Sequence, residues 1–342
     1  MTDKAASKPR VALALQGGGA HGAYTRGVIE RLLEANIEIV SVSGASAGAL
    51  NGAALVAGLA EDGPAGARAA LERLWHQVSR ESPLRVFDMA SFLLPFAEPW
   101  LTRGLEWSKL TSRYMAPFVP GLRDMSALRR VVGASIDLAQ LTRPSAIPLY
   151  VSATRVSDGQ ARLFTGAEVT LDALMASACL PDLFAAVRID GNEYWDGGFS
   201  ANPALEPLIF ADDGATDLLV VQVTPFAVED AGDTLPATIR RVSDISFNAC
   251  LMRDLKALVQ VQQLARAHAL TDGKVGQLAA MHLHLMTPAP GLATRGAASK
   301  LDTRASALRE LRVMGHAQAD AWLDGTGFGP DDALRHVTEV VA

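Results

Sequence analysis

The sequence predicts an α/β fold, a three-layer α/β/α sandwich with a largely parallel central sheet. Short apolar runs typical of buried strands alternate with helix-like segments along almost all of the 342 residues. This alternation favours a parallel sheet with helices on both faces. Apolar residues make up 49% of the chain, which is ample for a large core. No linker-like stretch divides the chain, so we expect a single domain over residues 10–342 after a flexible N-terminus at 1–9.

The first half of the chain shows the clearest strand and helix patterns. The run VALAL predicts a buried strand, and IEIVSVSG, rich in β-branched residues, predicts a second one. The expected elements are strands at 11–15 and 37–44 and helices at 22–36, 47–60 and 64–80. Residues 82–130 then mix prolines with short blocks of bulky apolar residues, which indicates an inserted or flanking helical region.

The second half continues the alternation. Expected strands lie at 147–156, 161–166, 217–225 and 281–288, and expected helices lie near 170–180 and over 235–271 and 299–325. Residues 187–198 predict a hairpin, because Asp190-Gly191-Asn192 supplies a turn between two strand-like runs. We interpret 235–342 as a helical C-terminal extension. Its long amphipathic helix is expected to pack over the core, and a dimer or membrane contact is the alternative.

Charge and composition exclude several classes of protein. The net charge is −6 and no long basic run occurs, so nucleic acid is not an expected partner. The first ten residues lack the apolar core of a signal peptide, and no uninterrupted apolar stretch of 18 residues predicts a spanning helix. Only Cys179 and Cys250 occur, which excludes a disulfide framework. A cytoplasmic location follows, with peripheral membrane association left open.

The strongest chemical signal is Gly44-Ala45-Ser46-Ala47-Gly48, a G-x-S-x-G motif between a predicted strand and a predicted helix. Small flanking residues permit a tight turn that projects the serine hydroxyl. The amides that follow Ser46 begin a helix, where negative charge is favoured. The motif therefore indicates a nucleophilic serine, and a glycine-rich turn with an idle serine is the alternative.

Three consecutive glycines follow the first strand, at Gly17, Gly18 and Gly19. An enzyme that forms an acyl-serine must stabilise an oxyanion, and backbone N–H groups without side chains are suitable donors. The same stretch fits the dinucleotide pattern G-x-G-x-x-G with Gly22 as its last glycine. However, the second strand ends at the serine motif rather than at an acidic residue, and Glu38 comes too early to bind a ribose. We therefore favour an oxyanion hole.

A serine nucleophile also needs a base. The histidines downstream of the serine motif are His76, His268, His282, His284, His316 and His336. None stands in a glycine-flanked loop, and each is better explained as a structural or exposed residue. Asp196-Gly197-Gly198 is the stronger candidate, because the aspartate ends a strand and two glycines allow a close approach. An ordinary turn aspartate is the alternative interpretation of this motif.

Together, these motifs resemble those of the patatin-like phospholipase family. The stretch Ser177–Phe184 is similar to that family's S-x-x-x-P-x-x-F segment, and the resemblance covers about residues 10 to 225. It implies a patatin-like fold and a Ser–Asp dyad that hydrolyses lipid acyl esters, of phospholipase A or lysophospholipase type, with no metal or cofactor. The implied site residues are Ser46 as nucleophile, Asp196 as base, Gly17, Gly18 and Gly19 as oxyanion hole, and His21, Gly22, Gly44, Gly48, Gly197 and Gly198 in supporting loops.

One position departs from the family pattern. The family's glycine loop usually carries Arg or Lys where this chain has His21. A permanent cation can attract a lipid phosphate, whereas histidine is mostly neutral at about pH 7. Neutral acyl esters and polyesters therefore stay open as substrates, and His21 is interpreted as a loop-positioning residue. Two further hypotheses also stay open, an acyltransferase with the same dyad and a catalytically silent lipid-binding protein.

The apolar side chains of residues 82–130 suggest a role for that segment. Phe87, Phe92, Trp100 and Trp107 offer more apolar area than a short surface element normally exposes. We expect a mobile helical cap over an apolar acyl site, with a peripheral membrane contact when the cap opens. The alternative is that these side chains complete the core.

Overall fold

The computed structural model describes residues 9–81, 124–228, 233–295, 297–325, 327–328 and 337–340 of the chain. Most of the cap expected at 82–130 lies outside these residues, as do His336 and all but the last residue of the expected flexible N-terminus.

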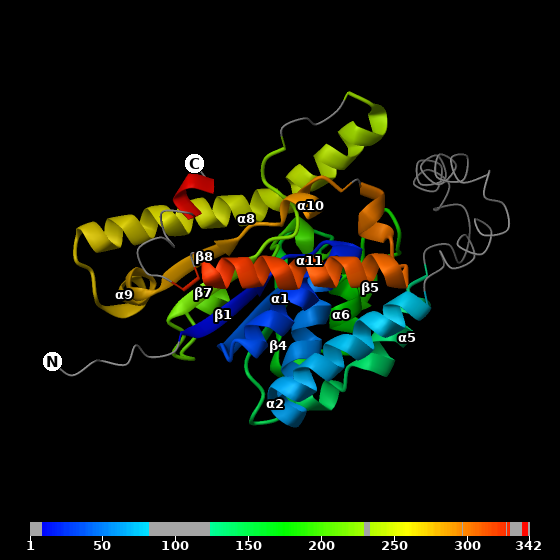
Figure 1. Ribbon diagram of the computed structural model, residues 1–342, viewed down its shortest axis with the longest axis horizontal. Helices are drawn as coiled ribbons and strands as arrows, with labels where there is room; N and C mark the ends of the chain where they lie inside the picture. Colours follow the sequence, from blue (N-terminus) through cyan, green and yellow to red (C-terminus); the bar gives the residue numbers. More distant parts are fainter. Residues whose placement is uncertain are drawn as a thin grey trace.

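One eight-stranded sheet forms the centre of the described fold (Figure 1). The strands are β1 (Arg10–Leu15), β2 (Glu38–Ala45), β3 (Leu149–Arg155), β4 (Ala161–Thr165), β5 (Val187–Ile189), β6 (Asn192–Asp196), β7 (Asp217–Val221) and β8 (His282–Met286). Their order is β5-β6-β3-β2-β1-β7-β8, and β4 pairs with β3 off this path. The pairs among β1, β2, β3, β7 and β8 are parallel, and those involving β4, β5 and β6 are antiparallel. The predicted fold class, with its largely parallel sheet, is confirmed.

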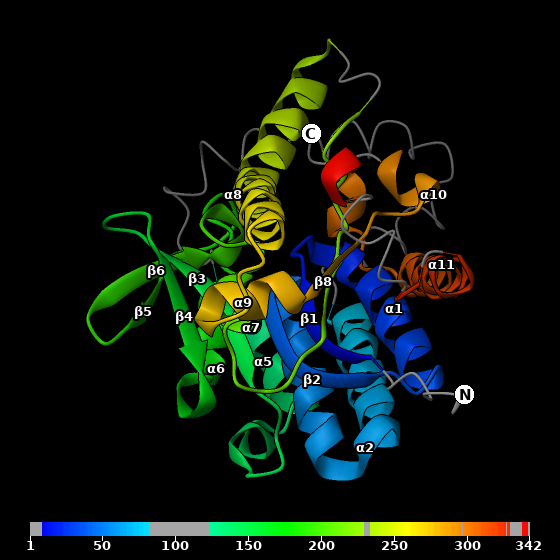
Figure 2. The same ribbon diagram turned by 90° about the vertical axis from the view of Figure 1, so that its left-hand side faces the viewer.

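Helices cover both faces of the sheet (Figure 2). One face carries α1 (Gly22–Glu34), α2 (Ala47–Arg80), α5 (Ser126–Ser135), α6 (Leu171–Ser177), α10 (Pro290–Ala293) and α11 (Ala305–Asp324), and the other carries α7 (Glu206–Ile209), α8 (Leu235–Ala267) and α9 (Gly273–Ala280). Successive strand residues point to opposite faces. In β1, Leu13 and Leu15 accordingly join the first core, while Ala12 and Ala14 join the second.

Most expected elements occur close to their expected bounds. The helices expected at 47–60 and 64–80 form α2, and Asp62 and Gly63 interrupt it with non-helical dihedral angles. The last long helix starts later than expected, at Ala305, because Ala297–Leu301 forms a separate 3-10 turn, η7. The remaining 3-10 turns are η1 (Gly19–His21), η4 (Leu138–Thr142), η5 (Gly166–Glu168) and η6 (Gly197–Phe199).

The expected C-terminal extension is built into the main fold. β8 pairs in parallel with β7 at the end of the sheet. α11 packs directly on α1, where a Cβ on Gly315 would come closer than 3 Å to the Tyr24 backbone. No described helix combines the length and apolar character that crossing a membrane requires.

The pairing of β3 brings the ends of β2 and β6 together. β4 occupies one edge of β3 from Tyr150 to Thr154. A strand has only two edges, so β2 and β6 share the other one, with Ala45 opposite Ser152 and Asp196 opposite Ala153. Because β2 is parallel and β6 antiparallel to β3, the two strands run toward each other and end at the same place.

Candidate active site

Ser46 occupies a sharp turn between β2 and α2. Its φ of 53° and ψ of −127° lie outside the regions that a non-glycine residue ordinarily adopts. A Cβ on Gly44 would come closer than 3 Å to the backbone of Gly48, and a Cβ on Gly48 closer than 3 Å to the Leu15 carbonyl. The turn therefore requires both flanking glycines. The Ser46 N–H donates to Ser177 Oγ at 2.9 Å, which fixes the turn to the end of α6.

Asp196 lies at the facing end of β6 and is 0% exposed. Its Oδ1 accepts the N–H of Gly198 at 2.8 Å. Its Oδ2 is buried and makes no hydrogen bond of standard geometry with a described residue. Burial raises the pKa of the carboxyl to about 7, against the opposing effects of the Gly198 amide and the nearby Ser46 hydroxyl. The site thus holds a carboxyl that accepts or releases a proton near neutral pH, close to a serine hydroxyl.

The glycine loop lies beside this pair. The Gly17 N–H donates to Asn202 Oδ1 at 2.8 Å, so it is already engaged. The N–H groups of Gly18 and Gly19 donate to no described residue. Gly19 has a φ of 58°, in the left-handed region, and a Cβ there would come closer than 3 Å to the Lys300 carbonyl. Only glycine combines this backbone conformation with this close approach.

His21 follows the loop and is almost fully buried. Its Nε2 lies 2.8 Å from Ser299 Oγ in η7. Burial, together with the nearby cations Lys300 and Arg295, lowers the pKa of its imidazole to about 3. His21 is therefore neutral near pH 7, and its contacts are those expected of a residue that positions the loop.

The other supporting glycines also make close approaches. A Cβ on Gly22 would come closer than 3 Å to the Trp75 ring, one on Gly197 to the Ser152 carbonyl, and one on Gly198 to the Phe247 ring. These contacts hold α1 against α2 and seat the Asp196 loop between β3 and α8. The structure thus brings the three predicted motifs together at the carboxyl ends of β1 and β2.

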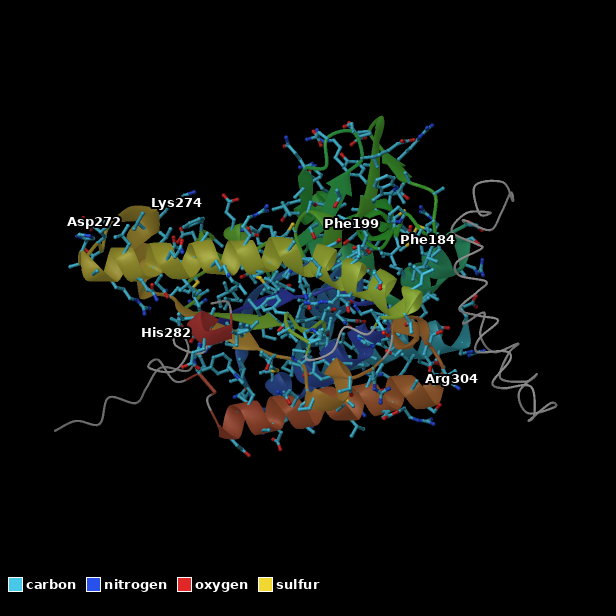
Figure 3. All side chains as sticks on the ribbon, turned by 90° about the horizontal axis from the view of Figure 1, so that it is seen from above. Phe184, Phe199, Asp272, Lys274, His282 and Arg304 are labelled. Atoms are coloured by element: carbon cyan, nitrogen blue, oxygen red, sulfur yellow. The ribbon has the colours of Figure 1, made fainter. Side chains whose placement is uncertain are left out.

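No described histidine hydrogen-bonds to Ser46 or Asp196. His284 Nε2 lies 2.7 Å from Asp217 Oδ1, and Asp217 pairs with His282 at the amino ends of β7 and β8. These are the opposite ends from those that carry the glycine loop and Ser46. Figure 3 shows His282 well away from Phe199, which ends the turn after Asp196. His316 pairs with Glu34 at 2.8 Å, and His76 and His268 are exposed on α2 and after α8.

Several polar residues that hold the site were not predicted from the sequence. Asn202 donates from Nδ2 to the Phe247 carbonyl at 2.9 Å, besides accepting from Gly17. Ser152 Oγ donates to the Ala201 carbonyl at 2.8 Å and so ties β3 to the loop after Asp196. Ser177 stands in the S-x-x-x-P-x-x-F segment, which could have suggested its role, whereas nothing local marks Ser152 or Asn202. Among the described residues, no group of three or more His, Cys, Asp or Glu side chains is arranged to hold a metal ion.

Comparison with known proteins identifies the family. A model of the patatin-like phospholipase family matches residues 13–209, more than half of the chain and all of the predicted site residues. The chain belongs to the patatin-like phospholipase family. In this patatin-like chain, α8 and η7 lie beyond the matched residues but still reach the site. Phe247 of α8 contacts the Asp196 loop, and Ser299 of η7 contacts His21.

More specific relatives are distant. Uncharacterized NTE family proteins from Mycobacterium bovis and from two strains of Mycobacterium tuberculosis are 28% identical over 208 residues, which is 61% of this chain and 46% of each relative. The match thus spans about half the length of these relatives. VipD from Legionella pneumophila has a TM-score of 0.42 at 14% identity, covering 94% of this chain and 69% of VipD. ExoU of Pseudomonas aeruginosa, solved with SpcU, has a TM-score of 0.33 at 16% identity, and the match covers 93% of this chain and 53% of ExoU.

Proposed function

We propose that this patatin-like chain is a serine acyl hydrolase that cleaves lipid ester bonds through Ser46 and Asp196. One observation carries the proposal. The strained turn at Ser46 and the buried carboxyl of Asp196 face each other at the ends of two strands on one edge of β3. A buried carboxyl with a pKa of about 7 destabilises the folded protein when it ionises, but it is suited to proton transfer near neutral pH. Family membership supports the same chemistry.

The acylation step uses each group in turn. Ser46 Oγ attacks the ester carbonyl carbon while its proton passes to Asp196 Oδ2, the oxygen without another partner among the described residues. The carbonyl oxygen becomes an oxyanion, which accepts hydrogen bonds from the N–H groups of Gly18 and Gly19. Gly17 is left out of this set, because its N–H donates to Asn202. Collapse of the intermediate breaks the ester C–O bond, and the departing alcohol takes the proton from Asp196.

Deacylation repeats the sequence with water. A water molecule attacks the acyl-serine carbonyl and gives one proton to Asp196. The second tetrahedral intermediate then releases the carboxylic acid, and the proton returns to Ser46 Oγ. One carboxyl thus acts as base and then as acid in each half-reaction, so the proposed mechanism needs no histidine or metal.

Product analysis on defined esters tests this proposal. Phosphatidylcholine, lysophosphatidylcholine and a short-chain p-nitrophenyl ester are incubated with the wild-type chain, with Ser46→Ala and with the matched control Ser79→Ala on the exposed part of α2. We expect fatty acid release by the wild type and the control, and none by Ser46→Ala. Cleavage of the diacyl lipid identifies phospholipase A activity, and cleavage of the lysolipid alone identifies a lysophospholipase.

The same assay distinguishes the hydrolase from related activities. An acyltransferase yields a new ester when glycerol is added, at the expense of free fatty acid. Hydrolysis confined to neutral esters assigns an esterase or depolymerase. A folded chain that cleaves none of these esters contradicts the proposed hydrolase.

A further inference from the structure

α8 carries a large share of the exposed apolar surface. Nine large apolar side chains are exposed in the described part of the chain, and five of them lie on this helix. Three belong to its amino-terminal part, namely Leu235, Val242 and Ile245, with exposed fractions of 60%, 59% and 51%. This part of α8 extends beyond the sheet and its covering helices (Figures 1 and 2).

These residues lie away from the side of α8 that packs on the sheet. Leu235, Val242 and Ile245 follow one another at intervals of seven and three residues, which places them on one side of the helix. Farther along α8, Leu251, Leu255 and Val259 are buried and join the core. α8 therefore packs over the core, as expected, and also presents an unpartnered apolar surface within the described structure.

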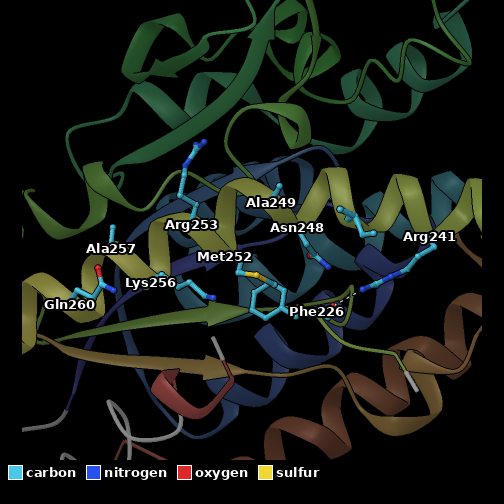
Figure 4. A pocket seen from close by; sticks show the side chains of 10 residues that line it. Phe226, Arg241, Asn248, Ala249, Met252, Arg253, Lys256, Ala257 and Gln260 are labelled. Carbon is cyan, nitrogen blue, oxygen red and sulfur yellow. Dashed lines mark hydrogen bonds between the residues drawn. The ribbon is translucent and has the colours of Figure 1, made fainter. Parts of the chain in front are cut away.

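Basic side chains lie along the same surface. A groove beside α8 is lined by the apolar residues Phe226, Ile245 and Met252. Arg241, Arg253 and Lys256 line it as well, and Figure 4 shows these three with Phe226 and Met252. We call Leu235, Val242, Ile245, Arg241, Arg253 and Lys256 the α8 docking face.

The cations of the docking face are only weakly neutralised by described residues. The Arg253 side chain is 74% exposed, and its ion pair is a long one, 3.8 Å, to the adjacent Asp254. Lys256 has no ion pair with a described residue. Arg241 is half-buried: its Nη2 donates to the Phe226 carbonyl at 3.1 Å and its Nη1 is buried without a described partner, so Arg253 and Lys256 are the more accessible cations. Asp244, the nearest other acid on α8, is buried and bound to Lys300 at 2.7 Å.

We propose that the α8 docking face binds the surface of an anionic phospholipid bilayer. Exposed apolar residues combined with Lys and Arg on one side of a helix are typical of helices that lie in a membrane interface. The chain as a whole carries a charge of −6, so an anionic bilayer repels it except where a local basic surface is turned toward the lipid. Charge thus selects both the partner and the orientation.

The position of α8 links this docking to the site. Its Phe247 packs on Gly198 and on the Phe199 ring, whose centroid lies 4.7 Å away. Its Asn248 accepts from Gln16 Nε2 at 2.8 Å, directly before the glycine loop. A helix is about 10 Å thick, so a docked bilayer lies within about one helix diameter of the Asp196 loop. This inference rests on the proposed function, because only a lipid substrate gives docking near the site a purpose.

Vesicle binding tests the proposal in the full chain. The Ser46→Ala background prevents lipid turnover, and binding is measured by co-sedimentation with phosphatidylcholine vesicles and with vesicles containing phosphatidylglycerol. The charge variant is Arg253→Glu with Lys256→Glu, and the apolar variant is Val242→Ser with Ile245→Ser. The control is Arg309→Glu with Val313→Ser on α11, where Val313 is 62% exposed.

We expect the parent to bind phosphatidylglycerol vesicles, with an affinity that falls as salt is added. The charge variant should bind at least about tenfold more weakly, since each cation near an anionic surface raises the affinity roughly fivefold. The apolar variant also binds more weakly, and the α11 control binds like the parent. Absence of binding by the parent, or equal binding by all variants, overturns the proposal. If the parent does not bind vesicles but forms a dimer that the α8 variants dissociate, the docking face is a dimer interface and the proposal is overturned.

A soluble short-chain ester keeps this test separate from that of the function. Chains with an intact Ser46 are assayed for hydrolysis of that ester. Hydrolysis without vesicle binding refutes docking and leaves the hydrolase standing. Vesicle binding without hydrolysis of any ester supports docking and refutes the hydrolase.

Discussion

Asn202 Oδ1 accepts the N–H of Gly17 at 2.8 Å. From Nδ2 the same side chain donates to the Phe247 carbonyl at 2.9 Å, so Asn202 joins the glycine loop to α8. In the proposed mechanism, this contact removes Gly17 from the oxyanion donors and leaves Gly18 and Gly19. It also makes the position of those two amides depend on a residue that touches no reacting atom.

Replacement of Asn202 therefore has a specific expected effect. Asn202→Ala leaves the buried Gly17 N–H without its partner and removes the extra hydrogen bond to the Phe247 carbonyl of α8, which costs about 1–3 kcal/mol of unfolding free energy. Because the loop loses its anchor, we expect kcat for a short-chain ester to fall about tenfold or more, with a smaller change in KM. Urea unfolding and steady-state kinetics measure the two effects. Asn192→Ala in the exposed β5–β6 turn is the control, and unchanged kcat in folded Asn202→Ala contradicts the positioning role.

Asp196→Asn separates catalysis from stability. The substitution keeps the shape and the Gly198 contact but removes the base, so we expect hydrolysis to fall by about 10² or more. The pKa of Asp196 is raised from 3.8 to about 7, so the folded state binds more protons than the unfolded state between these values. Asp196 thus makes the wild type less stable as pH rises through this window.

Asp196→Asn has no carboxyl to ionise at this position, so its stability does not fall with rising pH for this reason. At about pH 8 we expect Asp196→Asn to be more stable than the wild type, by roughly 1–3 kcal/mol in chemical unfolding, with the difference shrinking toward about pH 4. A variant that loses activity but gains no stability at the higher pH shows that the carboxyl is not the buried, destabilising group described above.

The same pKa predicts the pH dependence of catalysis. Only the carboxylate form of Asp196 accepts the serine proton, so kcat/KM for a soluble ester should rise with pH and reach half of its maximum near pH 7. Below that pH the carboxyl is protonated and activity falls. A profile that is flat from about pH 5.5 to about pH 8.5 argues against Asp196 as the base.

Histidine variants test whether the base is Asp196 alone. His284→Gln breaks the buried contact with Asp217, so it should cost about 1–3 kcal/mol of stability without lowering kcat of the folded enzyme. His21→Gln should reduce kcat modestly, because His21 supports the loop through Ser299. His268→Gln and His282→Gln should leave kcat unchanged. If one of these variants remains folded and is as inactive as Asp196→Asn, a triad replaces the proposed dyad.

The elements of this fold could be predicted from the sequence because their signals are local. Apolar runs, helical spacing and the Asp190–Asn192 turn each depend on a few neighbouring residues, and the structure has the corresponding strands and helices. The predicted start of α11 is wrong, because Ser299 and Lys300 contact the glycine loop in a separate 3-10 turn. No local pattern encodes that long-range contact.

The arrangement of the site was less predictable, for a similar reason. The three motifs identified Ser46 and Asp196, but their meeting depends on β2 and β6 sharing an edge of β3, a pairing between distant segments. The direction of the Asp196 pKa shift could not be predicted from the sequence, because burial and loop amides act in opposite directions. In the structure the carboxyl is completely buried, and this effect outweighs the opposing effects of the Gly198 amide and the Ser46 hydroxyl.

Covalent labelling of Ser46 is the sharpest test of the proposed dyad. The wild type, Ser46→Ala and Asp196→Asn are treated with a fluorophosphonate at about pH 8, and adducts are located by peptide mass spectrometry. Because only an activated serine reacts readily, we predict one adduct on the wild type, at Ser46, none on Ser46→Ala, and labelling slowed by about 10² or more in Asp196→Asn. An adduct that forms at the same rate on Ser46→Ala, or a folded wild type that is not labelled, contradicts the dyad.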